Sequence, residues 1–173
     1  MEKINVLFNE EKIERRVREL AEELYNKYHD EDVVFVCTLK GAVFFACDLM
    51  KNYPGDARME FLRVSSYEGE SSTGKISLKL PLDAEKVYGK HVVIVEDIVD
   101  TGFTLEFITD YVNNMHPKSL ITCALLDKKA RRLVKIDPDF SGFIIDDLFV
   151  IGYGLDYDQK YRNLPYIGVV VKD

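Results

Sequence analysis

The chain has few of the residues that disulfide-rich, zinc-binding or membrane-spanning proteins need. Its 173 residues include three cysteines and three histidines. Cys37, Cys47 and Cys123 lie far apart in apolar segments without a C-x-x-C pair, so we expect buried, reduced thiols. The histidines show no metal-ligand spacing, no apolar run approaches membrane-spanning length, and no cationic-then-apolar leader opens the chain. These absences predict a cytoplasmic protein without a membrane partner.

An excess of positive charge is also missing. Lysine and arginine number 23 against 30 aspartates and glutamates, which gives a net charge of −7. This balance disfavours nonspecific binding to nucleic acid or to anionic membranes. An anionic ligand would therefore need local backbone N–H groups, a few cations and a divalent metal. The length and the 47% hydrophobic content predict a single domain, residues 1–173.

Strand and helix patterns alternate along the chain. Helical spacing follows Asn9 and recurs over 42–52 and 104–115. Apolar runs predict strands at 33–38, 61–65, 91–95, 120–126, 143–145, 149–151 and 167–171, with 76–80 returning from a hairpin. This alternation predicts an α/β fold, a mostly parallel twisted sheet flanked by helices. The polar stretch 66–75 is interpreted as a loop, either a solvated connector or a lid.

The most informative segment begins with the apolar run 92–95, which leads directly into Glu96 and Asp97. A turn, residues 100–104, follows and opens a helix. Gly102 allows close backbone approach, and the free N–H groups of the helix start favour an anion. Neither Gly-Lys-Ser/Thr nor G-x-G-x-x-G is present here, so we expect a site for one terminal phosphate. The two carboxylates could hold ribose hydroxyls, a metal or a proton.

The segment Val-Glu-Asp-Ile-Val-Asp-Thr-Gly at 95–102 resembles the phosphoribosyl-diphosphate signature of type I phosphoribosyltransferases. Other matching motifs are Leu39-Lys40-Gly41, Ser66-Tyr67 with 72–74, Asp127-Lys128 and the segment 149–165. Together they narrow the resemblance to the hypoxanthine (6-oxopurine) members, over nearly the whole chain. The resemblance implies the type I phosphoribosyltransferase fold, with a mobile active-site loop at 66–76. It also implies a small purine-binding hood formed by 143–173 and N-terminal residues.

The resemblance also implies a reaction in purine salvage. The 5-phosphoribosyl group of phosphoribosyl diphosphate is transferred to hypoxanthine, and to guanine, through an oxocarbenium-like transition state. The products are inosine or guanosine monophosphate and diphosphate. The implied cofactor is Mg²⁺, and the implied assembly is a homodimer or homotetramer. The relative use of hypoxanthine, guanine and xanthine is not fixed by the sequence.

Site roles are likewise implied by the resemblance. Asp100 corresponds to the general base at purine N7, while Glu96 and Asp97 would face the ribose and, with Asp156, the metal. The family carries a non-proline cis peptide at the position of Leu39-Lys40. The remaining roles are 5′-phosphate binding by Asp100, Thr101, Gly102, Phe103 and Thr104, diphosphate binding by Lys40, Gly41 and Arg162, lid closure by Ser66 and Tyr67, and purine binding by Lys128, Phe149, Val150 and Asp156.

Two residues have ordinary structural interpretations when they are considered without the motifs. Lys128 lies in the charged run 127–132 and alone would be a surface lysine, and Phe149 alone would be a core aromatic.

Two other functions also fit the phosphate turn. One is a regulator that senses phosphoribosyl diphosphate and binds nucleic acid. The other is a receiver-like or nucleotide-binding α/β module without catalysis.

Overall fold

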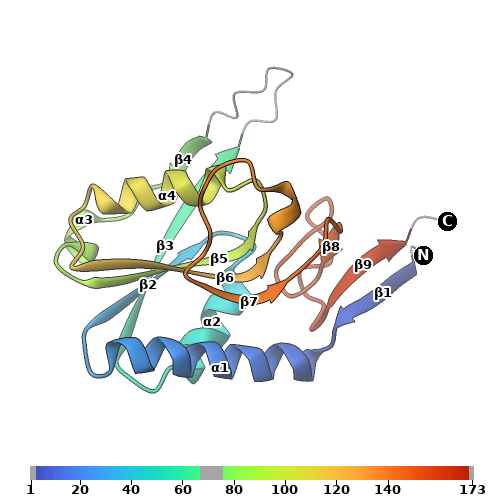
Figure 1. Ribbon diagram of the computed structural model, residues 1–173, viewed down its shortest axis with the longest axis horizontal. Helices are drawn as coiled ribbons and strands as arrows, with labels where there is room; N and C mark the ends of the chain where they lie inside the picture. The colour runs from blue at the N-terminus through green and yellow to red at the C-terminus, as the bar shows by residue number, and fades with distance from the viewer. Residues whose placement is uncertain (1–2, 67–75, 172–173) are drawn as a thin grey trace.

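The computed structural model describes residues 3–66 and 76–171, which form two β-sheets and their flanking helices (Figure 1). The larger sheet has six strands in the order β4-β3-β2-β5-β6-β7, and only the β3–β4 pair is antiparallel. The predicted mostly parallel sheet is therefore confirmed. The strand bounds are β2 Val33–Thr38, β3 Ala57–Ser66, β4 Ile76–Leu80, β5 His91–Val99, β6 Ser119–Asp127 and β7 Phe140–Ile144.

Helices cover both faces of this sheet (Figure 1). On one face lie α1 (Glu10–Tyr28) and α2 (Val43–Asn52), and on the other lie α3 (Ala84–Val87) and α4 (Phe103–Asn113). Asn9 caps α1 as predicted, because its side chain accepts a hydrogen bond of 3.0 Å from the Lys12 N–H. In the described part of the chain, no helix is long and apolar enough to cross a membrane.

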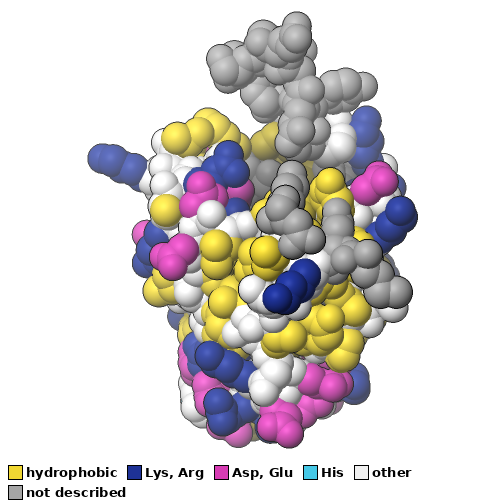
Figure 2. Space-filling view, turned by 90° about the vertical axis from the view of Figure 1, so that its right-hand side faces the viewer, with side chains coloured by type: hydrophobic (Ala, Val, Ile, Leu, Met, Phe, Trp, Pro, Cys, Tyr) yellow, Lys and Arg dark blue, Asp and Glu magenta, His cyan; other side chains and the backbone are white. Residues whose placement is uncertain are grey.

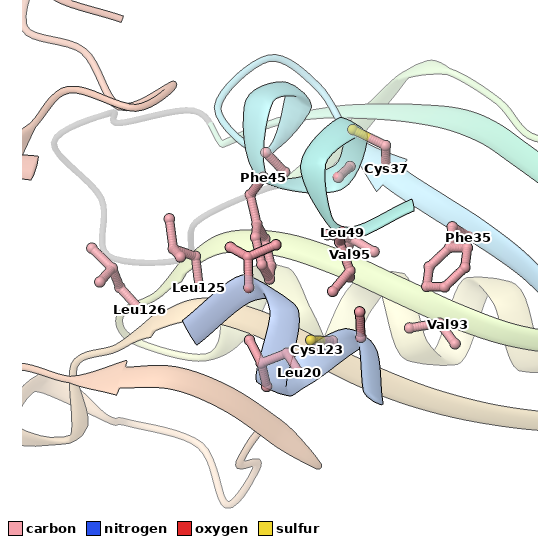
Figure 3. Close-up of a cluster of buried hydrophobic side chains, with 14 of the residues drawn as sticks. Leu20, Phe35, Cys37, Phe45, Leu49, Val93, Val95, Cys123, Leu125 and Leu126 are labelled. Atoms are coloured by element: carbon pink, nitrogen blue, oxygen red, sulfur yellow. The ribbon is translucent and has the colours of Figure 1, made fainter. Parts of the chain in front are cut away.

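The main core lies between the sheet and the helices α1 and α2. Figure 3 shows side chains from both layers pointing toward one another, including Leu20 of α1 and Phe45 of α2. Every residue of β2 is buried, as expected for a central strand covered on both faces. The positions of the strand ends are therefore fixed by a packed interior.

The chain leaves β2 and β5 toward opposite edges of the sheet. The connection through α2 leads from β2 to β3 on one side, and the connection through α4 leads from β5 to β6 on the other. The carboxyl ends of β2 and β5 therefore lie side by side with diverging loops. Open α/β sheets bind ligands at such a point.

The smaller sheet joins the two ends of the chain. Its order is β1-β9-β8, all antiparallel, with β1 at Lys3–Phe8, β9 at Ile167–Val171 and β8 at Val150–Ile151. Figure 2 faces this end of the molecule and shows hydrophobic side chains gathered across its middle, with charged ones at the lower edge. The strand β1 was not predicted, because half of its residues are exposed and its partner lies at the other end of the chain.

Several boundaries differ from the sequence-based predictions. The predicted strand 91–95 extends through Val99, because backbone pairing with β6 continues past the carboxylates. The strand predicted at 143–145 spans 140–144, and β8 begins at residue 150 rather than 149. Cys37 and Cys123 are buried as expected, but Cys47 is exposed, which corrects the expectation of three buried thiols. It lies on α2 between Ala46 and Leu49, which are buried in the core.

Candidate active site

A cavity of about 640 Å³ lies at the carboxyl ends of β2 and β5. It collects residues from segments that are distant in the sequence. Its polar lining includes Thr38, Lys40, Arg63, Ser65, Glu96, Asp97, Thr104, Asp156, Gln159 and Arg162. The structure thus brings the predicted metal ligands Glu96, Asp97 and Asp156 together with the predicted diphosphate-binding cations Lys40 and Arg162.

The loop after β2 packs directly against the acidic pair. The peptide bond between Leu39 and Lys40 is cis, as the resemblance implied. A Cβ atom at Gly41 would lie 1.7 Å from Asp97 Oδ2, so a side chain at this position is incompatible with the observed place of that carboxylate. Any side chain at residue 41 would therefore force the Asp97 carboxylate to move, and glycine allows the close approach that is observed.

Glu96 is a buried carboxylate with incomplete hydrogen bonding. Its Oε2 accepts a 2.7 Å bond from Thr38 Oγ1, and Oε1 is without a partner among the described residues. Burial is the main cause that raises the pKa of Glu96 to about 8; the charge of Asp97 adds to it and the Thr38 bond opposes it. Burial also raises the pKa of Asp97, although its Oδ1 accepts a 2.8 Å bond from the Ile98 N–H.

These carboxylates form an environment that favours a cation. Within residues 3–66 and 76–171, no three histidine, cysteine or acidic side chains are arranged as a metal site. Mg²⁺ commonly binds through one or two carboxylates and retains water and phosphate oxygens as its other ligands. Glu96, Asp97 and Asp156 line one cavity, and their hard oxygen donors fit an ion that arrives with a phosphate ligand.

A second cavity, of about 70 Å³, lies beside the turn between β5 and α4. It shares Glu96 and Thr104 with the first and is also lined by Asp100, Thr101 and Gly102. Gly102 has a φ of 94° and is the N-cap residue before α4, and no side chain of the described residues caps this helix. Its first N–H groups are thus available to an anion, as the sequence predicted.

Lys128 is buried next to Asp100. Only 7% of its side chain is exposed, and its Nζ lies 3.7 Å from Asp100 Oδ2 and 3.5 Å from Asp147 Oδ1. Arg131 lies 3.5 Å from the same Asp100 oxygen, whereas Asp100 Oδ1 is buried without a partner in the part of the chain that the structure describes. Lys128 is therefore not the surface lysine that its charged neighbours alone would suggest.

Phe149 also departs from its ordinary interpretation. It is 56% exposed and contacts Tyr157 edge-on, with ring centroids 5.6 Å apart. It is therefore available as a stacking surface rather than a core aromatic. Val150, in contrast, is buried in β8 and pairs with Val169.

The segment 152–162 supplies a polar network on the far side of the larger cavity. Asp156 and Arg162 form an ion pair of 2.7 Å. Gln159 donates its backbone N–H to Asp156 Oδ2 at 2.9 Å, and its Oε1 accepts bonds from Lys40 at 3.1 Å and from Arg162 at 3.3 Å. Gln159 was not predicted, because one amide in a polar segment gives no signal in the sequence.

Among the predicted site residues whose side chains the structure describes, four line neither cavity. Phe103 is 45% exposed at the start of α4, and Lys128 contacts Asp100. Val150 belongs to β8 of the smaller sheet, and Phe149 immediately precedes it. Ser66 ends β3, and Tyr67 lies outside the described residues, as does most of the predicted lid at 66–76.

Replacing Glu96 with glutamine should stabilise the metal-free protein at alkaline pH. The folded protein keeps a proton on Glu96 between its ordinary pKa of 4.5 and about 8, whereas the unfolded chain releases it. Stability therefore falls as the pH rises through that window. Glutamine abolishes this loss, so thermal unfolding with a chelator should show a melting-temperature gain that grows from pH 5 to pH 8. Each kcal/mol corresponds to roughly 2–4 °C for a chain of this size.

The matched control for this experiment is Glu22→Gln, on the exposed face of α1. Its melting temperature should follow that of the wild type at every pH. A Glu96→Gln protein that is less stable than the wild type at pH 8 would show that the carboxylate stabilises the fold and would contradict this assignment.

The sequence and the fold both match known proteins. The profile of the phosphoribosyl transferase domain matches residues 4–158. The hypoxanthine-guanine phosphoribosyltransferase of Aquifex aeolicus is 45% identical over 97% of this chain and 95% of its own length. The hypoxanthine phosphoribosyltransferase of Escherichia coli is 42% identical, over 97% and 96%.

Solved structures give the same result. The crystal structure of a hypoxanthine-guanine phosphoribosyltransferase from Bacillus anthracis has a TM-score of 0.92 and 40% identity, and the match covers 99% of each chain. The hypoxanthine phosphoribosyltransferase of Staphylococcus aureus has a TM-score of 0.91 and 40% identity, over 96% of this chain and 91% of its own. The chain therefore belongs to the phosphoribosyltransferase family and, within it, to the hypoxanthine phosphoribosyltransferases.

Proposed function

We propose that the protein transfers the 5-phosphoribosyl group of phosphoribosyl diphosphate to hypoxanthine and to guanine, for purine salvage. The observation that best supports this substrate class is the buried Lys128 ammonium, 3.7 Å from Asp100 at the edge of the phosphate turn. A cation held in this place can donate to a 6-oxo group while the neighbouring carboxylate accepts a ring proton. A site for sugar phosphates alone would not need that pair.

The larger cavity would hold the ribose and the diphosphate. Lys40 and Arg162 supply positive charge and Gly41 supplies close backbone approach, while Glu96 and Asp97 face the ribose. The bond between the anomeric carbon and the diphosphate oxygen breaks, and a bond to a purine ring nitrogen forms. Positive charge develops on the ribose in this step. A nearby cation favours the ionised form of both carboxylates, which then stabilise that charge electrostatically.

The phosphate turn would hold the 5′-phosphate through Thr101, Thr104 and the N–H groups at the start of α4. Asp100 would accept the purine proton at N7, and Lys128 would donate to the 6-oxo oxygen. Phe149 would stack on the purine ring, and Val150 would contact its edge through the backbone. Phe103 is 45% exposed and lines neither cavity, so its backbone N–H at the start of α4 is the group that fits the phosphate role.

Mg²⁺ would be held by Glu96, Asp97 or Asp156 together with the diphosphate, and when bound it would neutralise part of the charge on the leaving group. The ion pair between Asp156 and Arg162 keeps that carboxylate directed at the cavity. The protein residues thus supply orientation and charge on both sides of the bond that breaks.

Five features that the resemblance or the composition predicted are not tested by the structure and stay predictions. They are the single domain of 1–173, the hood of 143–173 with N-terminal residues, the lid at 66–76 with Ser66 and Tyr67, the cytoplasmic location and the homodimer or homotetramer. A nucleic-acid-binding regulator is disfavoured by the net charge of −7. A binding module without catalysis does not account for the buried pair of Asp100 and Lys128.

The first test is turnover of the three oxopurines. Protein supplied with Mg²⁺ and phosphoribosyl diphosphate should convert hypoxanthine to inosine monophosphate, and a chelator should abolish the reaction. Guanine and xanthine, assayed in parallel, will define the substrate range. Absence of product with all three bases would refute the proposed activity.

The second test concerns the proton acceptor. Asp100→Asn should lower kcat by roughly 100- to 10,000-fold, the usual contribution of a general base. The KM for phosphoribosyl diphosphate should change little, because the backbone of the turn is retained. Asp146→Asn, an exposed carboxylate near the same region, serves as the control. An Asp100→Asn enzyme with an unchanged rate would remove Asp100 as the base.

The third test concerns recognition of the 6-oxo group. Lys128→Gln should lower kcat/KM for hypoxanthine by roughly 10- to 100-fold, since a charged hydrogen bond contributes about 1.5–3 kcal/mol. Activity with adenine should not fall, so the preference for 6-oxo over 6-amino purines should narrow. The control is Lys129→Gln. Lys129 is the next residue and its side chain is 54% exposed, so this variant should keep the preference for 6-oxopurines. An equal loss of kcat/KM with hypoxanthine and adenine would argue against recognition of the 6-oxo group by Lys128.

A further inference from the structure

The segment Arg132–Ile136 lies directly behind the phosphate turn, outside both cavities. We propose that Arg132 is a positioning residue for the 5′-phosphate, which fixes the backbone of the turn at residues 99–102 from behind. This inference rests on the proposed phosphate-binding role of that turn. It assigns a function to an arginine that does not contact the substrate.

Arg132 uses all of its donor positions, and four of its five partners are backbone carbonyls or the buried carboxylate of Asp127. Its side chain is 11% exposed, and Nε donates to the Asp100 carbonyl at 3.1 Å while Nη2 donates to the Val99 carbonyl at 3.4 Å. Nη2 also contacts the carboxylate of Asp127, whose side chain is 2% exposed at the end of β6. The guanidinium thus ties the turn after β5 to the end of β6.

The other end of the guanidinium is anchored outside the turn. Nη1 bonds Asp137 Oδ1 at 2.7 Å and the carbonyl of Ile136. Only a planar fork with five N–H donors can serve these directions at once. A lysine at this position would keep the charge but could not reach the two turn carbonyls and Asp127 together.

The next carbonyl of the turn is held by the same segment. Thr101 O accepts from the Leu133 N–H at 2.9 Å and from the Val134 N–H at 3.4 Å. A Cβ atom at Gly102 would lie 2.7 Å from Val134 and 2.9 Å from the Arg132 side chain. The turn is therefore in van der Waals contact with its support and has no room to rotate toward it.

The fixed carbonyls determine where the N–H groups point. In a planar trans peptide, the C=O of one residue and the N–H of the next point in opposite directions. Three consecutive carbonyls, at residues 99–101, are held on the side of Arg132 and its neighbours. The N–H groups of residues 100–102 are consequently directed to the opposite side, where the cavity of about 70 Å³ lies. Arg132 thereby orients phosphate donors that it does not itself contact.

The reverse reaction offers a selective test, because its two substrates use different parts of the site. Inosine monophosphate needs the phosphate turn, whereas diphosphate needs the Lys40 and Arg162 region. Arg132→Lys should raise the KM for inosine monophosphate at least tenfold and leave the KM for diphosphate within about threefold of the wild type. A purely structural role would change both constants together, or would lower only the melting temperature.

Two control variants separate positioning from general stabilisation. Arg16 also bridges two backbone carbonyls, those of Ser141 and Gly142, but far from the turn, so Arg16→Lys should lower stability without changing the ratio of the two KM values. Asp137→Asn removes the negative charge of a partner of Arg132 whose side chain is 67% exposed, and it should likewise keep the ratio.

If Arg132→Lys does not fold, Val134→Ala tests the same support. It removes the contact under Gly102 and should raise the KM for inosine monophosphate several-fold, again without an effect on diphosphate. Unchanged or equally changed constants in the variant that folds would overturn the proposal. A wild-type protein that is inactive in both directions would instead refute the proposed function, so the two failures are distinguishable.

Discussion

The parallel pairing of β2 with β5 is the constraint on which the rest of the site depends. Its register places Cys37 opposite Val95, so the strand β2 ends beside the point where β5 becomes acidic. Thr38 then bonds Glu96, and the loop that follows meets Asp97 so closely that a Cβ atom at residue 41 would displace its carboxylate. A shift of one residue in this register would turn every side chain of β5 to the opposite face and separate these groups.

This arrangement places an unfavourable electrostatic interaction at the carboxyl edge of the sheet. Two adjacent carboxylates are buried together, and burial raises the pKa of each. The described residues offer Glu96 one hydrogen bond from Thr38 and leave its second oxygen unpaired, which a stability-optimised interior would avoid. The packed strands on either side supply the stability that tolerates this cost. A cation or a positively charged ribose relieves it, so the binding energy of the ligand is concentrated where the chemistry occurs.

The sequence predicted the features that depend on local pattern. The amphipathic period of α1, the apolar run of β2 and the acidic residues after a buried strand all carried a clear signal. The strand β1 lacked such a signal because its pairing partner is remote and only one of its six residues is fully buried. Periodicity also could not show that β5 continues past Asp97, since backbone pairing is independent of side-chain polarity.

The site was predictable to the extent that its residues form contiguous motifs. The burial of Lys128 and the exposure of Phe149 contradict what each residue type would suggest alone, and only the motif resemblance pointed to a function for them. Gln159 and Arg132 escaped prediction for a different reason. Each acts through contacts with segments that are far away in the sequence, and neither residue type distinguishes such contacts from solvent exposure.

The segment 127–137 links the subsites that the motifs describe separately. Its first residues contribute Asp127 and Lys128 at the end of β6, and the Lys128 N–H also donates to the Val99 carbonyl at 2.9 Å. Arg132 contacts the same carbonyl from the other end of the segment. The residue proposed to read the purine and the residue proposed to orient the phosphate donors are therefore anchored on one peptide group. A shift of the Val99 carbonyl would displace Lys128 and Arg132 together. The distance between the purine subsite and the phosphate subsite is therefore fixed by the fold rather than by the ligand.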